Sequence, residues 1–93
     1  MLTVVRGSFE WNSEKAARNL RAHQVSFDEA ATAVLDELAM IFEDALDSNR
    51  FIAIGASDQL RVLYVVHCER GERIRIISAR RASRHERKRY EGC

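Results

Sequence analysis

The most regular hydrophobic pattern of the chain follows Ser26. After this residue, apolar side chains recur at the spacing of one face of a helix. They are Phe27, Ala30, Ala31, Val34 and Leu35. Ser26 and Glu29 also have the spacing of a capping box, in which the serine accepts from the glutamate N–H and the glutamate side chain reaches back. We therefore predict an amphipathic helix that begins at Ser26 and buries this face.

The segment before this helix predicts a strand followed by another helix. Residues 8–11 read Ser-Phe-Glu-Trp, which places Phe9 and Trp11 on one side of a short strand. Asn12 is a favourable N-cap, and residues 13–23 are good helix formers with only a thin apolar stripe. The expected order in this part of the chain is therefore strand, helix, helix.

Beyond residue 37 the apolar period changes from that of a helix to that of a strand. Four alternating runs are predicted as strands: residues 38–43, 50–57, 59–69 and 72–80. The segments between them are too short for parallel crossovers, so we expect an antiparallel meander. The two helices are expected to pack on this sheet, and a short helix is predicted from Ser83. The fold class is therefore α+β.

The run 59–69 has apolar residues on both of its faces. One face is almost entirely apolar and is expected to meet the helices: Leu60, Val62, Tyr64, Val66 and Cys68. The other face has charged residues at its two ends and His67 beside Glu69. The length of the turn around Gly71 sets the register with the next strand, so the sequence leaves the cross-strand pairs open.

Composition narrows the class of protein. Ninety-three residues can bury one modest core, so residues 1–93 are expected to form a single domain. No apolar run approaches the roughly 20 residues of a membrane span, and the N-terminus lacks the layout of a signal peptide. A cytoplasmic protein is therefore predicted. Cys68 and Cys93 do not suffice for a disulfide scaffold, and no metal-ligand spacing surrounds them. Neither a metal nor a cofactor is expected.

The net charge of +1 conceals two halves of opposite sign. Residues 1–60 contain 5 basic and 10 acidic side chains, whereas residues 61–93 contain 10 basic and 4 acidic ones. This asymmetry favours a basic surface that binds a polyanion. The alternative is that the two halves neutralise each other across the fold.

The predicted C-terminal helix is too polar to be explained by burial. Over residues 82–91 only Ala82 and Tyr90 could pack against a core, and so short a helix is unstable alone in water. The basic side chains in or beside it could contact phosphates: Arg80, Arg81, Arg84, Arg87, Lys88 and Arg89. The alternative is a solvated helix held by ion pairs from Glu86 and Glu91 to arginines three or four residues away. We favour phosphate binding, because such pairs stabilise a helix only slightly.

The same half of the chain contains groups that could cleave RNA without a metal. Such cleavage needs a base for the 2′-OH proton, an acid for the leaving 5′ oxygen and a cation for the phosphorane-like transition state. The candidate proton carriers are His67, Glu69, His85, Glu86 and Tyr90. Taken alone, His67 is more simply explained as a strand-end histidine with a satisfied hydrogen bond.

Three blocks of the sequence together resemble the BrnT family, whose members are ribonuclease toxins of type II toxin–antitoxin systems. The blocks are FEWNSEKAARNLRAHQVSFDEA, RFIAIGAS and RIRIISARRASRHERKRYE, at residues 9–30, 50–57 and 73–91. The family pattern usually has Asp at the position of Asn12 and Gly at that of Gln24. Asn12 keeps the capping role. Gln24 is expected to adopt a conformation that glycine reaches more easily, such as the left-handed one.

The resemblance implies a RelE-like fold and an endoribonuclease that inhibits translation and growth. The implied partners are an RNA substrate and a BrnA-type antitoxin, in a heterotetramer with two copies of each protein. DNA would be contacted only through the antitoxin, and no membrane is involved. We expect the antitoxin to cover the basic face and so block RNA.

For this enzyme we predict two groups of site residues. The residues predicted to matter for turnover are His67, Glu69, Arg80 and Arg81, with an arginine stabilising the transition state and His67 or Glu69 transferring protons. The predicted RNA-binding residues are Arg61, Arg73, Arg75, Arg84, Arg87, Lys88 and Tyr90. The competing hypothesis is a non-catalytic module that binds nucleic acid or a protein partner.

Overall fold

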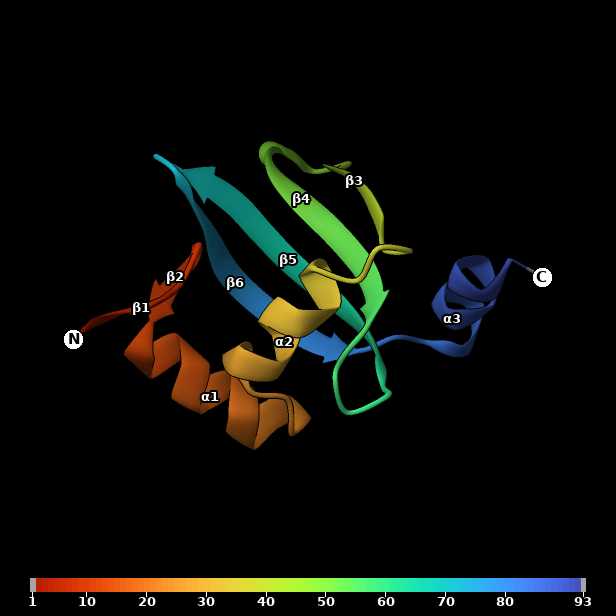
Figure 1. Ribbon diagram of the computed structural model, residues 1–93, viewed down its shortest axis with the longest axis horizontal. Coiled ribbons are helices and arrows are strands. Elements are labelled where there is room, and N and C mark those ends of the chain that lie inside the picture. Colours follow the sequence, from red (N-terminus) through yellow and green to blue (C-terminus); the bar gives the residue numbers. More distant parts are fainter. Residues whose placement is uncertain (1, 93) are drawn as a thin grey trace.

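A six-stranded sheet carries two helices on one face and a third helix apart from them (Figure 1). The computed structural model describes residues 2–92. The helices are α1 (Ser13–His23), α2 (Phe27–Val34) and α3 (Arg84–Glu91). The strands are β1 (Thr3–Arg6), β2 (Phe9–Asn12), β3 (Met40–Asp44), β4 (Asp47–Ala56), β5 (Val62–Arg70) and β6 (Arg73–Arg81). The predicted α+β class is confirmed, and none of these helices is long and apolar enough to span a membrane.

The strand order is β1-β2-β6-β5-β4-β3, which makes the sheet mixed. Strands β3 to β6 form the predicted antiparallel meander. Strand β1 is an addition that the sequence pattern did not indicate. Strand β2 pairs in parallel with β6, with Phe9 opposite Ile74. The prediction of a purely antiparallel sheet is therefore wrong at this edge, because no local turn signal links segments so far apart in the sequence.

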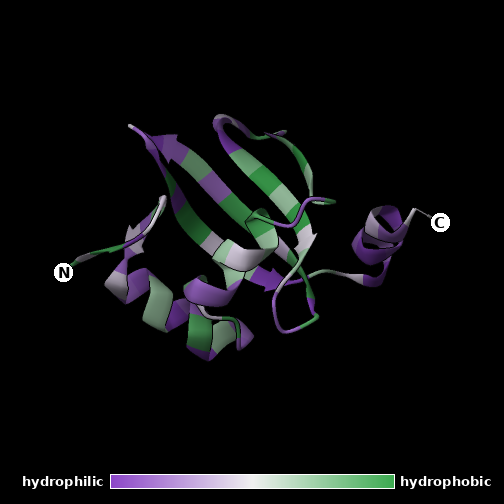
Figure 2. Ribbon diagram, in the orientation of Figure 1, coloured by the Kyte–Doolittle hydropathy of each residue, from purple (hydrophilic) through white to green (hydrophobic). Residues whose placement is uncertain are grey.

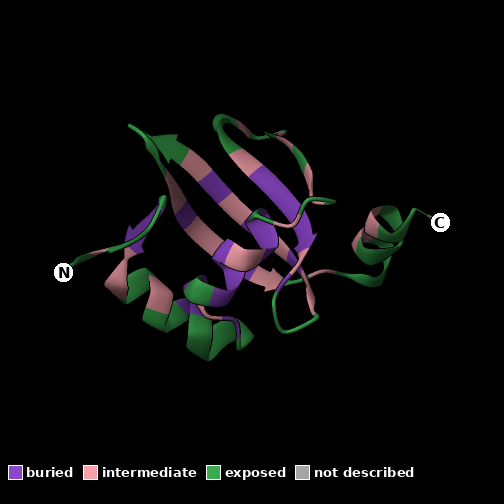
Figure 3. Cartoon of the chain, viewed as in Figure 1, coloured by how far each residue is buried: buried purple, intermediate pink, exposed green. Residues whose placement is uncertain are grey.

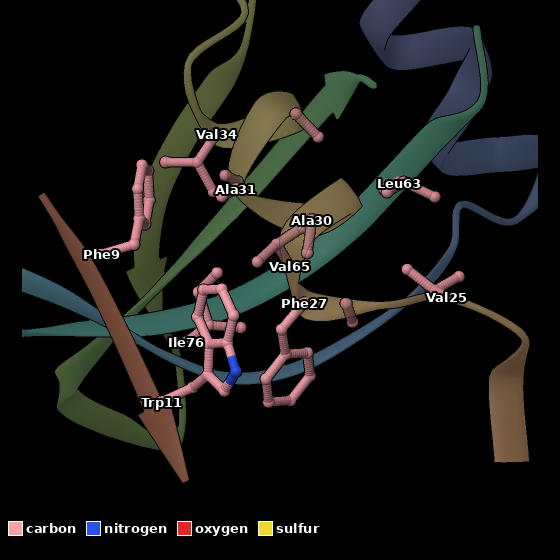
Figure 4. Packing of buried hydrophobic residues seen from close by; sticks show 13 residues of the cluster. Phe9, Trp11, Val25, Phe27, Ala30, Ala31, Val34, Leu63, Val65 and Ile76 are labelled. Atoms are coloured by element: carbon pink, nitrogen blue, oxygen red, sulfur yellow. The ribbon is translucent and has the colours of Figure 1, made fainter. Parts of the chain in front are cut away.

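The main core lies between the sheet and the two N-terminal helices (Figure 4). The predicted apolar face of α2 is buried except at Leu35, which is 65% exposed because the helix ends at Val34. The rings of Trp11 and Phe27 meet edge to face with centroids 6.0 Å apart. At Gly55 of β4, a Cβ atom would lie 2.3 Å from the carbonyl oxygen of Ala33. Glycine therefore lets α2 approach the sheet closely.

The predicted orientation of β5 is wrong. Leu63 and Val65 are fully buried and belong to the core beneath the helices, whereas Tyr64 and Val66 lie half-buried on the opposite face. Figure 3 shows this alternation of buried and intermediate positions along β5. We call the side that carries α1 and α2 the helical face and the other side the second face. The second face has apolar residues of its own, including the buried Ile54. A count of apolar residues therefore could not tell which face of β5 meets the helices.

The ends of the first two helices agree largely with the predicted signals. Asn12 Oδ1 accepts from the N–H groups of Glu14 and Lys15, and Gln24 has the expected left-handed conformation, with φ 56°. Ser26 Oγ accepts from the N–H of Glu29 at 3.0 Å. The Glu29 side chain does not complete the predicted capping box but binds Arg61 and Ser57. It thereby joins α2 to the β4–β5 loop.

Asn19 attaches α1 to the edge of β6 beyond the short pairing with β2. Its amide nitrogen donates to the carbonyl oxygens of Ala79 and Val25 at 2.8 and 3.0 Å, and its Oδ1 accepts from the Ala79 N–H at 3.1 Å. The side chain is buried. A side-chain amide thus takes the place of a neighbouring strand at this part of the β6 edge.

Candidate functional site

Arg80 is fixed on the second face of the sheet. Its cross-strand partner is Tyr64, and its guanidinium carbon lies 3.9 Å from the centroid of the Tyr64 ring. Nη1 and Nη2 donate to the two carboxylate oxygens of Glu86 at 2.8 and 2.9 Å, and Nη1 also donates to the Arg81 carbonyl at 3.2 Å. The Arg80 side chain is still 40% exposed. It is therefore held in one orientation and remains accessible to an anionic ligand.

Glu86 is itself held from two directions. It completes a capping box at the start of α3, since its Oε1 accepts from the Ser83 N–H at 2.8 Å and its own N–H donates to Ser83 Oγ. Arg80, and to a lesser degree the Ser83 N–H, lower the pKa of Glu86 to about 2, and Glu86 in turn raises the pKa of Arg80. Glu86 is therefore ionised at neutral pH and positions Arg80 as an ion pair.

Helix α3 is hydrophilic along most of its length (Figure 2), yet one row of its side chains contacts the sheet and the loop between α2 and β3. Besides Glu86, the Tyr90 hydroxyl donates to Asp36 Oδ2, which also accepts from the Ala56 N–H at 2.9 Å. The Arg89 guanidinium lies 5.7 Å from the centroid of the Phe42 ring. The Tyr90 hydrogen bond lowers the pKa of Asp36. These contacts dock the helix without an apolar core.

The predicted ion pairs within the helix are therefore not what holds Glu86. Its partner is Arg80, six residues earlier on β6. The residues on the outer side of α3 are exposed: Arg84, Arg87 and Lys88. They form a basic surface next to Arg80, as expected for phosphate contacts, whereas the predicted RNA ligand Tyr90 is half-buried in the docking contact.

We predicted that His67 and Glu69 act together with Arg80 and Arg81. In the structure the two pairs of residues lie apart. In the observed register His67 pairs with Ile76 and Glu69 with Ile74, whereas Arg81 pairs with Leu63. At about 3.3 Å per residue, His67 is roughly 13 Å along β5 from the residue opposite Arg81. Its side chain also lies on the helical face, 5% exposed, and burial lowers its pKa. The four predicted turnover residues therefore do not form one cluster.

The remaining predicted RNA contacts also fall into different environments. Arg61 donates to Glu29 and to the Gln24 carbonyl on the helical face, which lowers the pKa of Glu29. Arg75 forms an ion pair with Glu10, and both side chains are mostly buried. Arg73 is exposed at the β5–β6 turn, at the opposite end of β6 from Arg80. Arg61 and Arg75 are thus engaged in structural ion pairs.

Tyr64 is a residue of the site that the sequence pattern did not indicate. The alternation of β5 placed it on the face expected to meet the helices, and its pairing with Arg80 depends on a two-residue turn at Gly71 and Glu72. The register then shifts by one residue between Val66 and His67, and no sequence pattern predicts this shift.

Among residues 2–92 no group of three or more His, Cys, Asp or Glu side chains is arranged to hold a metal ion.

Comparison with known proteins identifies the family of this chain. Residues 11–86 match the model of "Ribonuclease toxin, BrnT, of type II toxin-antitoxin system". The chain belongs to the BrnT family. A crystal structure of the Brucella abortus ribonuclease toxin BrnT is similar to it, with a TM-score of 0.66 and 26% sequence identity over 80% of this chain and 94% of that one. A search of curated proteins finds no match. Membership of this family implies an RNA substrate and an antitoxin partner.

Proposed function

We propose that this BrnT-family chain is a metal-independent endoribonuclease. The ribose 2′-OH attacks the adjacent phosphorus, the 5′ oxygen of the next nucleotide leaves, and a 2′,3′-cyclic phosphate remains. Cleavage inhibits translation and growth, and a BrnA-type antitoxin neutralises the toxin in a complex with two copies of each protein. The match of residues 11–86 to a ribonuclease family supports the reaction class. The RelE-like fold that the resemblance implies is part of the same proposal.

The Arg80 cluster is the observation that supports the location of the site. Charge on the nonbridging phosphate oxygens grows in the transition state, and a preorganised cation in a fixed place stabilises it. Arg80 meets this requirement, because Tyr64 supports its flat face and Glu86 holds two of its nitrogens. The exposed Arg84, Arg87 and Lys88 on the neighbouring helix would hold the RNA backbone. We therefore place cleavage on the second face, beside α3.

Proton transfer needs a group near Arg80 that can gain and lose a proton near neutral pH. Glu86 is a weak base because its pKa is lowered to about 2. His67 lies buried on the other side of the sheet. His85 is exposed in the first turn of α3, next to Glu86 in the sequence, and an imidazole can act as acid or base. We assign proton transfer to His85. The predicted roles of His67 and Glu69 can be tested in the same assay.

The decisive experiment is RNA cleavage by the purified toxin in excess chelator, with analysis of the new ends. We expect 2′,3′-cyclic phosphate and 5′-hydroxyl ends. His85→Ala should slow cleavage, whereas the double variant His67→Ala, Glu69→Ala should cleave at a rate close to that of the wild type. A large loss of cleavage rate in the double variant, with no loss in His85→Ala, would instead assign proton transfer to His67 or Glu69. Intact RNA with salt-sensitive binding would instead support the non-catalytic module.

A further inference from the structure

Helix α2 covers only part of the helical face. In Figure 1 the end of the sheet that carries the β3–β4 and β5–β6 turns has no helix in front of it. The alternation of β5 continues there from the buried Val65 to His67 and Glu69 on the same face. The side chains at this end must therefore be covered by one another, by solvent or by a partner.

A pocket of about 220 Å³ opens at this end of the helical face. It is lined by Ile41, Phe51, His67, Glu69 and Ile74, from four different strands. The pocket is mainly apolar, and Ile41 at its margin is 54% exposed although it is a large aliphatic side chain. An exposed apolar depression of this kind is typical of a surface that receives a side chain of another molecule.

His67 gives the pocket a specific polar requirement. The ring is 5% exposed and stacks on Phe51, with centroids 6.1 Å apart and planes 22° from parallel. Within residues 2–92 neither ring nitrogen has a hydrogen-bond partner. Buried polar atoms are usually paired, because leaving them without a partner costs free energy. A partner that brings a peptide or hydroxyl group into the pocket would remove this cost.

The charge around the pocket indicates what kind of partner fits. Glu69 lines the pocket, and Glu43 extends from the same face because it pairs with Phe51. Both residues are exposed. On the helical face this end therefore carries two carboxylates, in contrast to the basic surface of α3, while the exposed Arg50, Arg70 and Arg73 at the same end alternate onto the other face.

We propose that this pocket is a docking site for a segment of the antitoxin. The segment places one apolar side chain against Ile41 and Phe51, a backbone or hydroxyl group against His67, and lysines or arginines against Glu43 and Glu69. This inference rests on the proposed function, which supplies the antitoxin. The antitoxin would then make two separate contacts with the toxin. One segment binds in the pocket and anchors the antitoxin, and another covers Arg80 and α3 and blocks RNA.

The test uses the toxin and its cognate antitoxin, with binding measured by calorimetry and RNA cleavage measured in parallel. Ile41→Glu and Glu43→Lys should each weaken binding by about tenfold or more, because the first removes an apolar contact and the second reverses a charge that the partner faces. Both should cleave RNA as the wild type does and should resist neutralisation in growth assays. Leu60→Glu and Glu14→Lys are matched controls, since both residues are exposed and lie outside the pocket lining.

His67→Phe separates docking from a purely structural role of the histidine. Phenylalanine keeps the stacking on Phe51 and removes the unpartnered nitrogens. We expect the free toxin to become more stable while its affinity for the antitoxin falls. A stabilised variant with unchanged affinity would overturn the role of His67, and unchanged binding by Ile41→Glu and Glu43→Lys would overturn the docking site.

Two further outcomes are distinguishable from these. If the toxin alone forms a dimer that Ile41→Glu converts to a monomer, the occupant is a second copy of this chain and the proposal is wrong. If the wild type binds the antitoxin through the pocket but cleaves no RNA, the proposed catalytic function fails while the docking site stands. The cleavage and binding measurements thus test the two proposals separately.

Discussion

Arg80 illustrates how one residue can serve both the fold and the proposed reaction. Its contact with the Tyr64 ring and its paired bonds to Glu86 bring together β5, β6 and α3. A planar guanidinium can satisfy all these contacts at once, whereas an ammonium group cannot present the same fork. The preorganisation that we propose for catalysis therefore depends on the shape of the side chain as well as on its charge.

Substitution of Arg80 by lysine tests this dependence on shape. The positive charge remains, so RNA binding should change little, but the paired bonds to Glu86 are lost. We expect the cleavage rate to fall about 100-fold, the usual cost of removing one preorganised donor at a developing charge. Single-turnover cleavage and filter binding would measure the two effects. Arg73→Lys, at the far turn of β6, is the matched control and should cleave normally. Equal rates for the two variants would contradict the role of Arg80.

Helix α3 shows how a short polar element can be held in place by specific contacts. It has no buried residue. Glu86 and Arg89 contact β6 and β3, and Tyr90 contacts Asp36 in the loop between α2 and β3. The capping box and the Arg80 ion pair share the carboxylate of Glu86. The start of the helix and its position on the sheet are therefore coupled through one side chain.

Glu86→Gln should loosen this helix in a pH-dependent way. The pKa of Glu86 in the folded protein is about 2, below the value of about 4.3 for a glutamate in an unfolded chain. The ionised carboxylate therefore stabilises the fold above about pH 4.3, and this contribution is lost as the pH falls toward 2. We expect the variant to lose about 1 kcal/mol of unfolding free energy at pH 7, because solvent screens a pair whose arginine is 40% exposed.

Urea unfolding of both proteins between pH 7 and pH 3 would measure this effect. The difference between wild type and Glu86→Gln should shrink on acidification, while the exposed Glu72→Gln control should match the wild type throughout. A difference that stays constant down to pH 3 would mean that the ion pair with Arg80 does not stabilise α3.

The ends of the helices were predictable from the sequence because each helix end is determined by residues close to it in the chain. The N-cap at Asn12, the left-handed Gln24 and the capping box at Ser83 each depend on a few neighbouring residues. The parallel pairing of β2 with β6 and the exposed face of β5 depend on contacts between distant segments. The candidate site follows the same division: Arg80 and the basic helix were predicted, but Tyr64 and the separation of His67 required the register.

At the scale of the whole molecule, the opposite charges of the two halves of the sequence become charges on different surfaces. Glu29 of the acidic half pairs with Arg61 of the basic half, and Glu10 pairs with Arg75, so part of the asymmetry is neutralised inside the fold. The remaining basic residues of α3 stay exposed on one side, and Glu43 and Glu69 stay exposed at the uncovered end of the helical face. Internal neutralisation thus describes part of the molecule, and the exposed basic residues of α3 are the surface on which we propose that the polyanion binds.

This distribution predicts which basic residues control the salt dependence of RNA binding. The triple variant Arg84→Gln, Arg87→Gln, Lys88→Gln should lower the slope of log affinity against log salt by about 2, because each phosphate contact on single-stranded RNA contributes about 0.7. The chain supplies its own control in α1, where Lys15, Arg18 and Arg21 are also exposed. Their triple substitution by glutamine makes the same change in charge but should leave the slope almost unchanged. An equal decrease in both variants would show that RNA binds by net charge alone, and α3 would then have no special part in holding it.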